Sequence, residues 1–267
     1  MNTGKMASLH HGTTRLRRGI LAVTGVLAAA ALVACGPQGG TDVGNGRSVK
    51  LQLQGYEAPP RAGTQSITTA SGVTIEGAWV AVDRIRFVPA ANCDEPQTEI
   101  DVEGPFVADL AGPGVLGGPI DFAVASDTFC ELRVGFHTLE AGTEPVGAPP
   151  ALSGASIWVM GKRADGEAFT VTSRLSERLE LEAKDAGGFS LAAGDNPLFV
   201  AYELGSWVDA LGLDTLATPI VVDDDQNADR LQPFEDAVKT SIRLLRDDDE
   251  DGVLDQTEAE TGDELAD

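Results

Sequence analysis

Hydrophobic and polar residues alternate along much of the chain, a pattern typical of half-buried β-strands. The stretch 49–54 alternates strictly, and alternation resumes over 73–87, where Gly77 is a candidate bulge. Further strands are predicted at 98–110, 119–124, 129–137, 156–162, 167–173, 178–182 and 197–204. Turn signals separate them at intervals of roughly 8–12 residues, and Asp165-Gly166 is typical of a hairpin. The pattern predicts a mainly β chain folded as an antiparallel β-sandwich.

Two segments show helical spacing instead. Residues 231–246 (LQPFEDAVKTSIRLLR) are predicted to form an amphipathic helix. Its large apolar residues fall on one face: Phe234, Val238, Ile242 and Leu245. A shorter helix is predicted at 206–213, with Ser206 as its N-cap.

The N-terminus combines basic residues with an uncharged apolar run. Four bases and no acid lie before residue 19: Lys5, Arg15, Arg17 and Arg18. The apolar run over 19–33 has about 15 residues, whereas a helix needs roughly 20 to span a bilayer. A basic segment followed by such a run is typical of a signal peptide.

The motif LVAC at residues 32–35 resembles the bacterial lipobox, in which small residues precede a cysteine that is acylated on sulfur before cleavage. The resemblance implies a lipoprotein signal peptide over 1–34 and a mature chain that begins with lipid-bearing (palmitate-type) Cys35. The alternatives are a single membrane anchor and an ordinary cleaved signal. The glycine-rich segment 35–47 is predicted to be a flexible tether. Gly36 is not an acid, which by resemblance to lipoprotein sorting signals implies the outer membrane.

The sharpest motif is DDDEDGVLDQTE at 247–258, which reads D-x-D-x-D-G-x-x-D-x-x-E. Calcium binds about six to eight oxygen atoms at roughly 2.3–2.6 Å, and this spacing brings carboxylates together as the chain coils. Gly252 permits the sharp turn that such a loop needs. The candidate ligands are the side chains of Asp247, Asp249, Asp251, Asp255 and Glu258 and the backbone carbonyl of Val253.

This motif resembles the EF-hand calcium loop, with 231–246 in the place of the preceding helix. It also resembles thrombospondin type 3 and dockerin-like loops, because the segment after Glu258 is too poor in apolar residues for a full second helix. The alternative is an acidic disordered tail. Asp223 and Asp225 begin a similar spacing, but Ala228 occupies the glycine position, so 223–229 is interpreted as a helix-capping loop.

Charge supports cation binding and argues against nucleic acid. The chain has 19 Lys+Arg and 42 Asp+Glu, a net charge of −23. Removal of 1–34 takes four bases and no acid, which leaves 15 against 42, a net of −27. A chain with this much negative charge is repelled by nucleic acids and by anionic membrane surfaces. It is therefore not expected to bind either of them by electrostatic attraction. Residues 221–267 hold 17 acids and four bases, which predicts a C-terminal module over 223–267 beside a sandwich domain over 48–222.

Two cysteines remain besides Cys35. Cys93 and Cys130 are predicted to form a disulfide, because an exported chain folds in an oxidising compartment. The alternative is two buried free thiols. Two cysteines without a nearby histidine pair give too few ligands for zinc.

Motifs for catalysis are missing from the sequence. The mature chain has one histidine, His137, which is interpreted as a surface or strand-edge residue. The chain contains no G-x-S-x-G, G-x-x-x-x-G-K-[ST] or H-E-x-x-H, so we predict that it is not an enzyme. Trp79, Trp158 and Trp207, with the many carboxylates, leave a carbohydrate-binding or glycan-hydrolysing surface domain as the alternative.

The predicted sandwich resembles the immunoglobulin-like or prealbumin-like domains of bacterial surface lipoproteins. Together these features predict a lipid-anchored, non-enzymatic binding or structural protein of the cell envelope that binds calcium. The expected partners are the membrane, through Cys35, and an envelope protein or a glycan.

Overall fold

A computed structural model describes residues 46–57, 66–92 and 100–267. Residues 43–267 form one compact unit. The signal peptide over 1–34, Cys35 and Cys93 lie outside the described residues. Lipidation of Cys35 and a disulfide between Cys93 and Cys130 therefore stay predictions.

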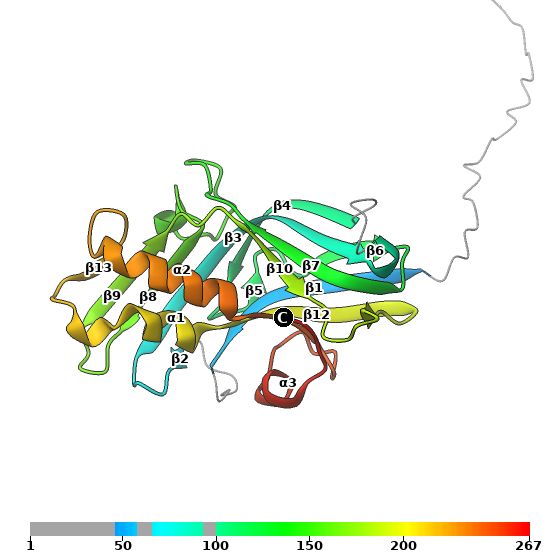
Figure 1. The fold of residues 1–267 in the computed structure, drawn as a ribbon. Helices are drawn as coiled ribbons and strands as arrows, with labels where there is room; N and C mark the ends of the chain where they lie inside the picture. The colour runs from blue at the N-terminus through cyan, green and yellow to red at the C-terminus, as the bar shows by residue number, and fades with distance from the viewer. Residues whose placement is uncertain (1–45, 58–65, 93–99) are drawn as a thin grey trace, which may run out of the picture. The chain divides into compact units, whose positions relative to one another are not determined.

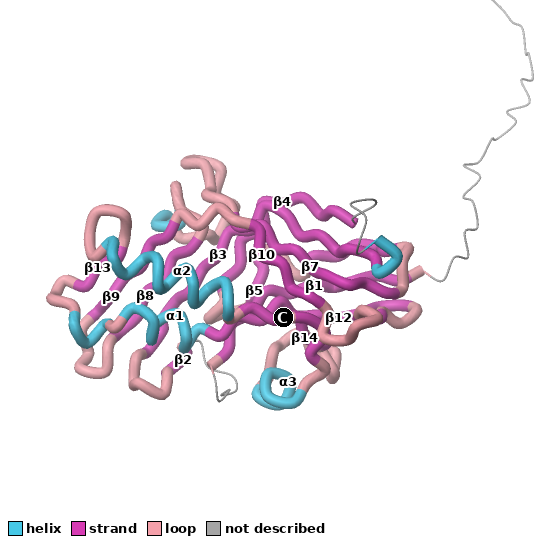
Figure 2. Tube along the Cα trace, viewed as in Figure 1, coloured by secondary structure: helices cyan, strands magenta, loops and turns pink. Residues whose placement is uncertain are grey.

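The described residues form two sheets that pack face to face (Figure 1, Figure 2). The first has the order β15-β14-β12-β1-β6. Its strands are β1 (Arg47–Tyr56), β6 (Ile120–Val124), β12 (Gly194–Glu203), β14 (Ile242–Arg246) and β15 (Glu264–Ala266). The second has the order β10-β7-β3-β8-β9-β13, with β2, β4, β5 and β11 attached. Its strands are β2 (Ile67–Thr68), β3 (Thr74–Pro89), β4 (Ile100–Asp109), β5 (Gly114–Val115), β7 (Thr128–Phe136), β8 (Ile157–Lys162), β9 (Ala168–Ser173), β10 (Arg178–Glu182), β11 (Phe189–Ser190) and β13 (Ile220–Val222).

The core lies between the sheets and is filled by inward-facing side chains from both. In β1 the buried positions are Val49, Leu51 and Leu53, as the alternation predicts. In the facing sheet Phe87 and Phe129 meet edge to face, with ring centroids 5.4 Å apart. The predicted β-sandwich is confirmed.

Two strand pairs depart from the predicted antiparallel arrangement. β1 pairs with β12 in parallel, and β9 pairs with β13 in parallel. Alternation reports which face of a strand is buried, but it carries no information on the neighbouring strand or its direction. Parallel neighbours need a crossover connection, and the chain between β1 and β12 builds most of the second sheet.

Turn and bulge residues predicted the local features of the second sheet correctly. β8 and β9 form an antiparallel hairpin, and Gly166 in its turn has a φ of 92°. Residues 74–89 form one long strand, β3, whose register against β8 shifts between Ile75 and Gly77. Gly77 therefore lies at the predicted bulge.

Two longer helices, α1 (Leu204–Leu211) and α2 (Leu231–Thr240), lie side by side (Figure 1). The fully buried Trp207 of α1 packs edge to face on Phe234 of α2, with ring centroids 5.8 Å apart. Four short 3-10 helices complete the fold: η1 (Ala90–Asn92), η2 (Pro150–Leu152), η3 (Leu213–Thr215) and η4 (Ala228–Arg230). No helix in the described part of the chain is long and apolar enough to cross a membrane.

The start of α1 differs from the prediction. The helix begins at Leu204, and the Ser206 hydroxyl lies in its first turn, where it donates to the Glu203 carbonyl at 2.8 Å. Ser206 is therefore not the N-cap. The helix begins earlier because Leu204 and Trp207 both enter the core.

The predicted helix over 231–246 is wrong beyond Thr240. Residues 242–246 form β14, which pairs antiparallel with β12. Leu244 faces the main core, whereas Leu245 packs with Phe199 in a smaller cluster on the other face of the sheet. The spacing of the apolar residues in this segment fits both a helix and a strand. The segment forms a strand because it pairs with β12.

The C-terminal segment is part of the sandwich and not a separate module over 223–267. β14 and β15 belong to the first sheet, and Ala266 also bridges to Ala183, directly after β10 of the second sheet. Backbone hydrogen bonds join Lys184 N–H to the Leu265 carbonyl and Glu182 N–H to the Asp267 carbonyl. The last strand therefore ties the two sheets together. The acidic composition that suggested a boundary at residue 222 reflects solvent-facing positions and the loop after β14.

Replacement of Leu265 tests this integration. Leu265 is 6% exposed and lies in the main core, so Leu265→Ala is expected to lower the free energy of unfolding by about 2–5 kcal/mol. Denaturant unfolding followed by tryptophan fluorescence measures this, because Trp79, Trp158 and Trp207 all lie before residue 222. The control is Val146→Ala, at a fully exposed position, which is expected to change stability by less than about 0.5 kcal/mol. Coincident tryptophan transitions for Leu265→Ala and the unmodified protein would show that the C-terminus folds independently.

Candidate metal centre

The acidic motif forms the connection between β14 and the short helix α3 (Gln256–Thr261). Leu245 before the loop and Ala259 after it pack in the smaller cluster with Tyr56 and Phe199, and Leu254 of the loop packs against this cluster. Figure 1 shows α3 beside the end of the first sheet. Both ends of the loop are therefore fixed on the sheet by apolar contacts.

Three of the predicted ligands come together in the loop. Carboxylate oxygens of Asp247, Asp249 and Glu258 lie within 4.8 Å of one another. Asp247 and Glu258 are 3% and 5% exposed, whereas Asp249 is exposed. The cluster thus has a buried base and an opening to solvent on the side of Asp249.

Hydrogen bonds from the backbone hold the first half of the loop in a tight coil. Asp249 accepts from Asp251 N–H at 3.1 Å, and Asp251 accepts from Val253 N–H at 2.7 Å. Asp247 Oδ2 accepts from Gly252 N–H at 2.9 Å. Gly252 has a φ of 76°, a conformation that glycine adopts without strain from a Cβ atom.

The second half of the loop begins α3. Asp255 is the N-cap and accepts from Glu258 N–H at 2.9 Å, while Glu258 accepts from Asp255 N–H at 3.1 Å, so the two residues form a capping box. The other Glu258 oxygen accepts from Asp248 N–H at 2.8 Å. The helix start therefore orients Glu258 toward Asp247.

Gln54 of β1 is a residue of this site that the sequence did not reveal. Its amide Nε2 donates to the Gly252 carbonyl and its Oε1 accepts from Leu254 N–H, both at 2.8 Å. Gln54 is 6% exposed, and these two contacts hold the loop against β1 near the end of that strand. No pattern around residue 54 signals this role, because the contact spans about 200 residues of chain.

One carboxylate oxygen in the cluster lacks a partner. Asp247 Oδ1 is buried and makes no hydrogen bond to the described residues. Burial raises the pKa of Asp247 and of Glu258, and each is raised further by neighbouring carboxylates, Asp249 among them. A buried anionic oxygen without a donor is unfavourable unless a cation compensates it.

The remaining predicted ligands do not join the three-residue cluster. The carboxylates of Asp251 and Asp255 serve as caps for backbone N–H groups. Val253 is 53% exposed at the outer turn of the loop. These residues are near the cluster in sequence, but their donor atoms are not among the atoms that lie within 4.8 Å of one another.

The surroundings of the loop differ from the helix–loop–helix expected from the EF-hand resemblance. A strand, β14, precedes the loop, and the helix that follows has six residues. The short helix α3 agrees with the expectation that the segment after Glu258 does not form a full second helix. The preceding helix, α2, ends at Thr240, before β14 begins.

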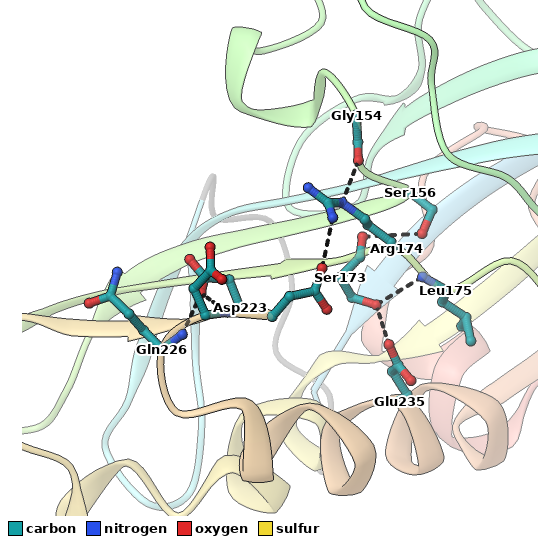
Figure 3. A network of polar contacts seen from close by, with 10 residues as sticks. Gly154, Ser156, Ser173, Arg174, Leu175, Asp223, Gln226 and Glu235 are labelled. Carbon is teal, nitrogen blue, oxygen red and sulfur yellow. Dashed lines mark hydrogen bonds and ion pairs between the residues drawn. The ribbon is translucent and has the colours of Figure 1, made fainter.

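The segment at 223–229 forms a hydrogen-bonded turn, but its side chains do not cap a helix as predicted: the N-caps of η4 and α2 are Asn227 and Arg230, and neither makes a side-chain capping hydrogen bond. Asp223 accepts from the N–H groups of Asp225 and Gln226 at 2.8 and 2.7 Å. Figure 3 shows this turn beside Arg174, whose guanidinium donates to the Gly154 carbonyl and to Asp224. Arg174 thus compensates the charge of Asp224.

Other candidate functional residues are placed as follows. His137 follows β7 and is exposed, in agreement with its interpretation as a surface residue. Trp207 is fully buried and donates from Nε1 to the Ser241 hydroxyl at 2.6 Å, so it cannot stack on a sugar. Trp79 and Trp158 lie opposite each other on β3 and β8 and pack in a small outer cluster with Leu139 and other residues.

Comparison with known proteins does not assign the chain to a family. No protein-family model matches it, and no curated protein matches it. Among solved structures, MbnP from Methylosinus trichosporium is similar at a TM-score of 0.31 and 11% identity, over 58% of this chain and 75% of that chain. A likeness at this level assigns neither a family nor a function.

Replacement of Asp247 tests the electrostatic cost of the metal-free cluster. Asp247→Asn is expected to raise the stability of the metal-free protein at neutral pH, because the amide removes a buried charge and supplies donors to the neighbouring carboxylates. The acid pKa values of Asp247 and Glu258 are raised on folding. Their stabilising contribution is therefore complete below the unfolded pKa of about 4 and is lost as the pH rises through the folded pKa values.

Denaturant unfolding in metal-free buffer between pH 4 and pH 8 measures this effect. The stability difference between Asp247→Asn and the unmodified protein is expected to grow with pH. A difference that stays constant across this range would show that Asp247 ionises without cost.

Proposed function

We propose that the chain is a lipid-anchored envelope protein that binds one calcium ion in the loop 247–258. The observation that carries the proposal is the buried, unpartnered Oδ1 of Asp247, a residue whose carboxylate belongs to the cluster with Asp249 and Glu258. A cation supplies the partner that this oxygen lacks and offsets the repulsion among the three carboxylates.

The chemistry of the donor set favours calcium over other metals. The three clustered groups are all carboxylates, the hard oxygen ligands that calcium and magnesium prefer, and no histidine or cysteine belongs to the cluster. The loop is an irregular coil open to solvent beside Asp249, and calcium tolerates irregular geometry better than magnesium. The order of residues in the calcium-loop pattern supports the same choice.

The hydrogen bonds of the loop support a largely preformed site. Gln54, Gly252 and the capping box fix the backbone, so binding requires little ordering of the chain. The Asp251 carboxylate would turn from its backbone cap to complete the coordination, together with the Val253 carbonyl, and Asp255 would bind through a water while it stays in the capping box. A single loop with this cost is expected to bind at about 10⁻⁴–10⁻³ M, as in extracellular calcium modules.

Calcium titration by calorimetry on the full chain in a non-ionic detergent tests the site. The unmodified protein is expected to bind one calcium ion, and the pair Asp247→Asn, Glu258→Gln is expected to lose binding by at least tenfold. The matched control is Asp223→Asn, Asp225→Asn, which removes two charges from the turn at 223–229 and should leave binding unchanged. Equal affinity in the loop variant and the unmodified protein would disprove the assignment.

Lipid attachment at Cys35 is the second part of the proposal, and it rests on the lipobox-like residues 32–35. Cys35→Ser is expected to move the protein from the membrane fraction to the soluble or unprocessed fraction and to abolish labelling by radioactive palmitate. Gly36→Asp is the matched variant. It is expected to keep the label but to shift the protein from the outer to the inner membrane on a density gradient. Full labelling of Cys35→Ser would rule out this anchor.

Within this proposal the sandwich is a binding or structural domain and not an enzyme, with an envelope protein or glycan as its partner. The alternative of a carbohydrate-binding or glycan-hydrolysing domain gains no support from Trp207, which is buried. Trp79 and Trp158 are partly covered by the outer cluster. The carbohydrate alternative therefore has no specific observation in its favour.

A further inference from the structure

The acidic loop and β15 are connected by a short piece of chain with little freedom to bend. Only Gly262 and Asp263 separate α3 from β15. Gly262 N–H donates to the Glu258 carbonyl at 3.0 Å, and a Cβ atom at Gly262 would overlap that carbonyl oxygen. In Figure 1, α3 projects from the first sheet, and the chain returns from it to the body of the sandwich. A displacement of Glu258 therefore moves the start of β15 as well.

Arg243 of β14 adds a second link between α3 and β15. Its guanidinium donates to the Ala259 carbonyl of α3 at 3.2 Å and approaches the Glu264 carboxylate of β15 at 3.4 Å. The guanidinium carbon lies 4.7 Å from the centre of the Tyr56 ring, and this cation–π contact orients the side chain. Ala259 directly follows Glu258, so Arg243 contacts both the helix that carries a proposed calcium ligand and the strand that follows it.

Strand β15 has few contacts of its own. It has three residues and pairs with β14 through Glu264 and Ala266, with an irregular register. Backbone hydrogen bonds to Glu182 and Lys184 join this segment to the second sheet, as does an ion pair from Lys184 to Glu264 at 2.9 Å. Ion pairs at the surface contribute little to stability. A strand this short opens locally more easily than the long strands of the core.

Repulsion in the acidic loop acts between a fixed residue and a movable one. Asp247 directly follows β14, and its N–H donates to the Pro197 carbonyl of β12 at 3.1 Å. Glu258 belongs to α3, which packs on the sheet through Ala259. The carboxylates of Asp247 and Glu258 lie together in the largely buried cluster. In the metal-free protein their repulsion pushes α3 away from the end of β14, and a cation between them holds the two elements together.

We propose that calcium in the loop 247–258 controls whether residues 256–266, which we call the latch, stay closed on the sandwich. The inference rests on the proposed function, because it requires calcium at Asp247 and Glu258. With the ion bound, α3 stays on the sheet and β15 stays paired with β14. In the metal-free protein, α3 and β15 detach transiently as one unit. This opening exposes the edge of β14 that β15 occupies and the core residues that Leu265 covers.

Thermodynamic linkage gives the size of the effect. Because opening separates Asp247 from Glu258, calcium binds only the closed latch. The ratio of closed to open latch is then multiplied by one plus the calcium concentration divided by Kd. With the Kd of about 10⁻⁴–10⁻³ M expected for a single loop, a calcium concentration of about 10 mM raises this ratio roughly 10–100-fold. Amide hydrogen exchange measures the ratio wherever exchange requires opening.

Hydrogen exchange of the full chain in non-ionic detergent, with about 10 mM calcium and without calcium, tests the proposal. In the metal-free protein, the amides of 257–267 are expected to exchange faster than those of the β8–β9 hairpin. Calcium is expected to slow exchange of the latch roughly 10–100-fold. Equal exchange of the latch and the hairpin in the metal-free protein would overturn the proposal, because β15 would then open only with the whole sandwich.

Calorimetry on the same samples measures calcium binding independently. Calcium binding without a change in the exchange of the latch would overturn the latch and leave the calcium site in place. Absence of binding would overturn the proposed function and the latch with it. These comparisons use the unmodified protein and do not depend on the folding of a variant.

Arg243→Gln tests the link between α3 and β15. Arg243 is not a calcium ligand, so the affinity is expected to stay within about threefold, while the slowing of exchange by calcium at 264–267 is expected to fall at least threefold. The matched control is Lys184→Gln, which removes another cation that pairs with Glu264. It is expected to speed exchange of β15 equally with and without calcium. The same loss of the calcium effect in both variants, or its full retention in Arg243→Gln, would refute coupling through Arg243.

Discussion

Burial of alternate apolar side chains between two sheets is the interaction on which the rest of this structure depends. It fixes the inward face of every long strand, and it recruits the C-terminal segment because β12 offers an edge for β14. The last strand then ties the first sheet to the end of β10 in the second. The position of the acidic loop follows from this pairing, since the loop begins where β14 ends.

The acidic loop combines a rigid backbone with an unfavourable charge arrangement. Backbone N–H groups and the amide of Gln54 hold the coil, and the capping box directs Glu258 toward Asp247. The same contacts leave Asp247 Oδ1 buried without a partner. Like charges that lie together in a largely buried cluster destabilise the metal-free protein. Binding of a cation offsets this repulsion and stabilises the fold.

The sequence by itself determined the properties that depend on local order: the β-sandwich class, the hairpin at Gly166, the bulge near Gly77 and the coiled acidic loop. Each follows from periodicity or from a backbone conformation that few residues adopt. Tertiary structure decided what depends on partners: the parallel pairs, the change from helix to strand after Thr240, the contact from Gln54 and the inclusion of the C-terminus in the sandwich. These outcomes depend on contacts between segments that are distant in the chain. The energies of such contacts exceed local conformational preferences, and the local sequence does not reveal which segments will meet.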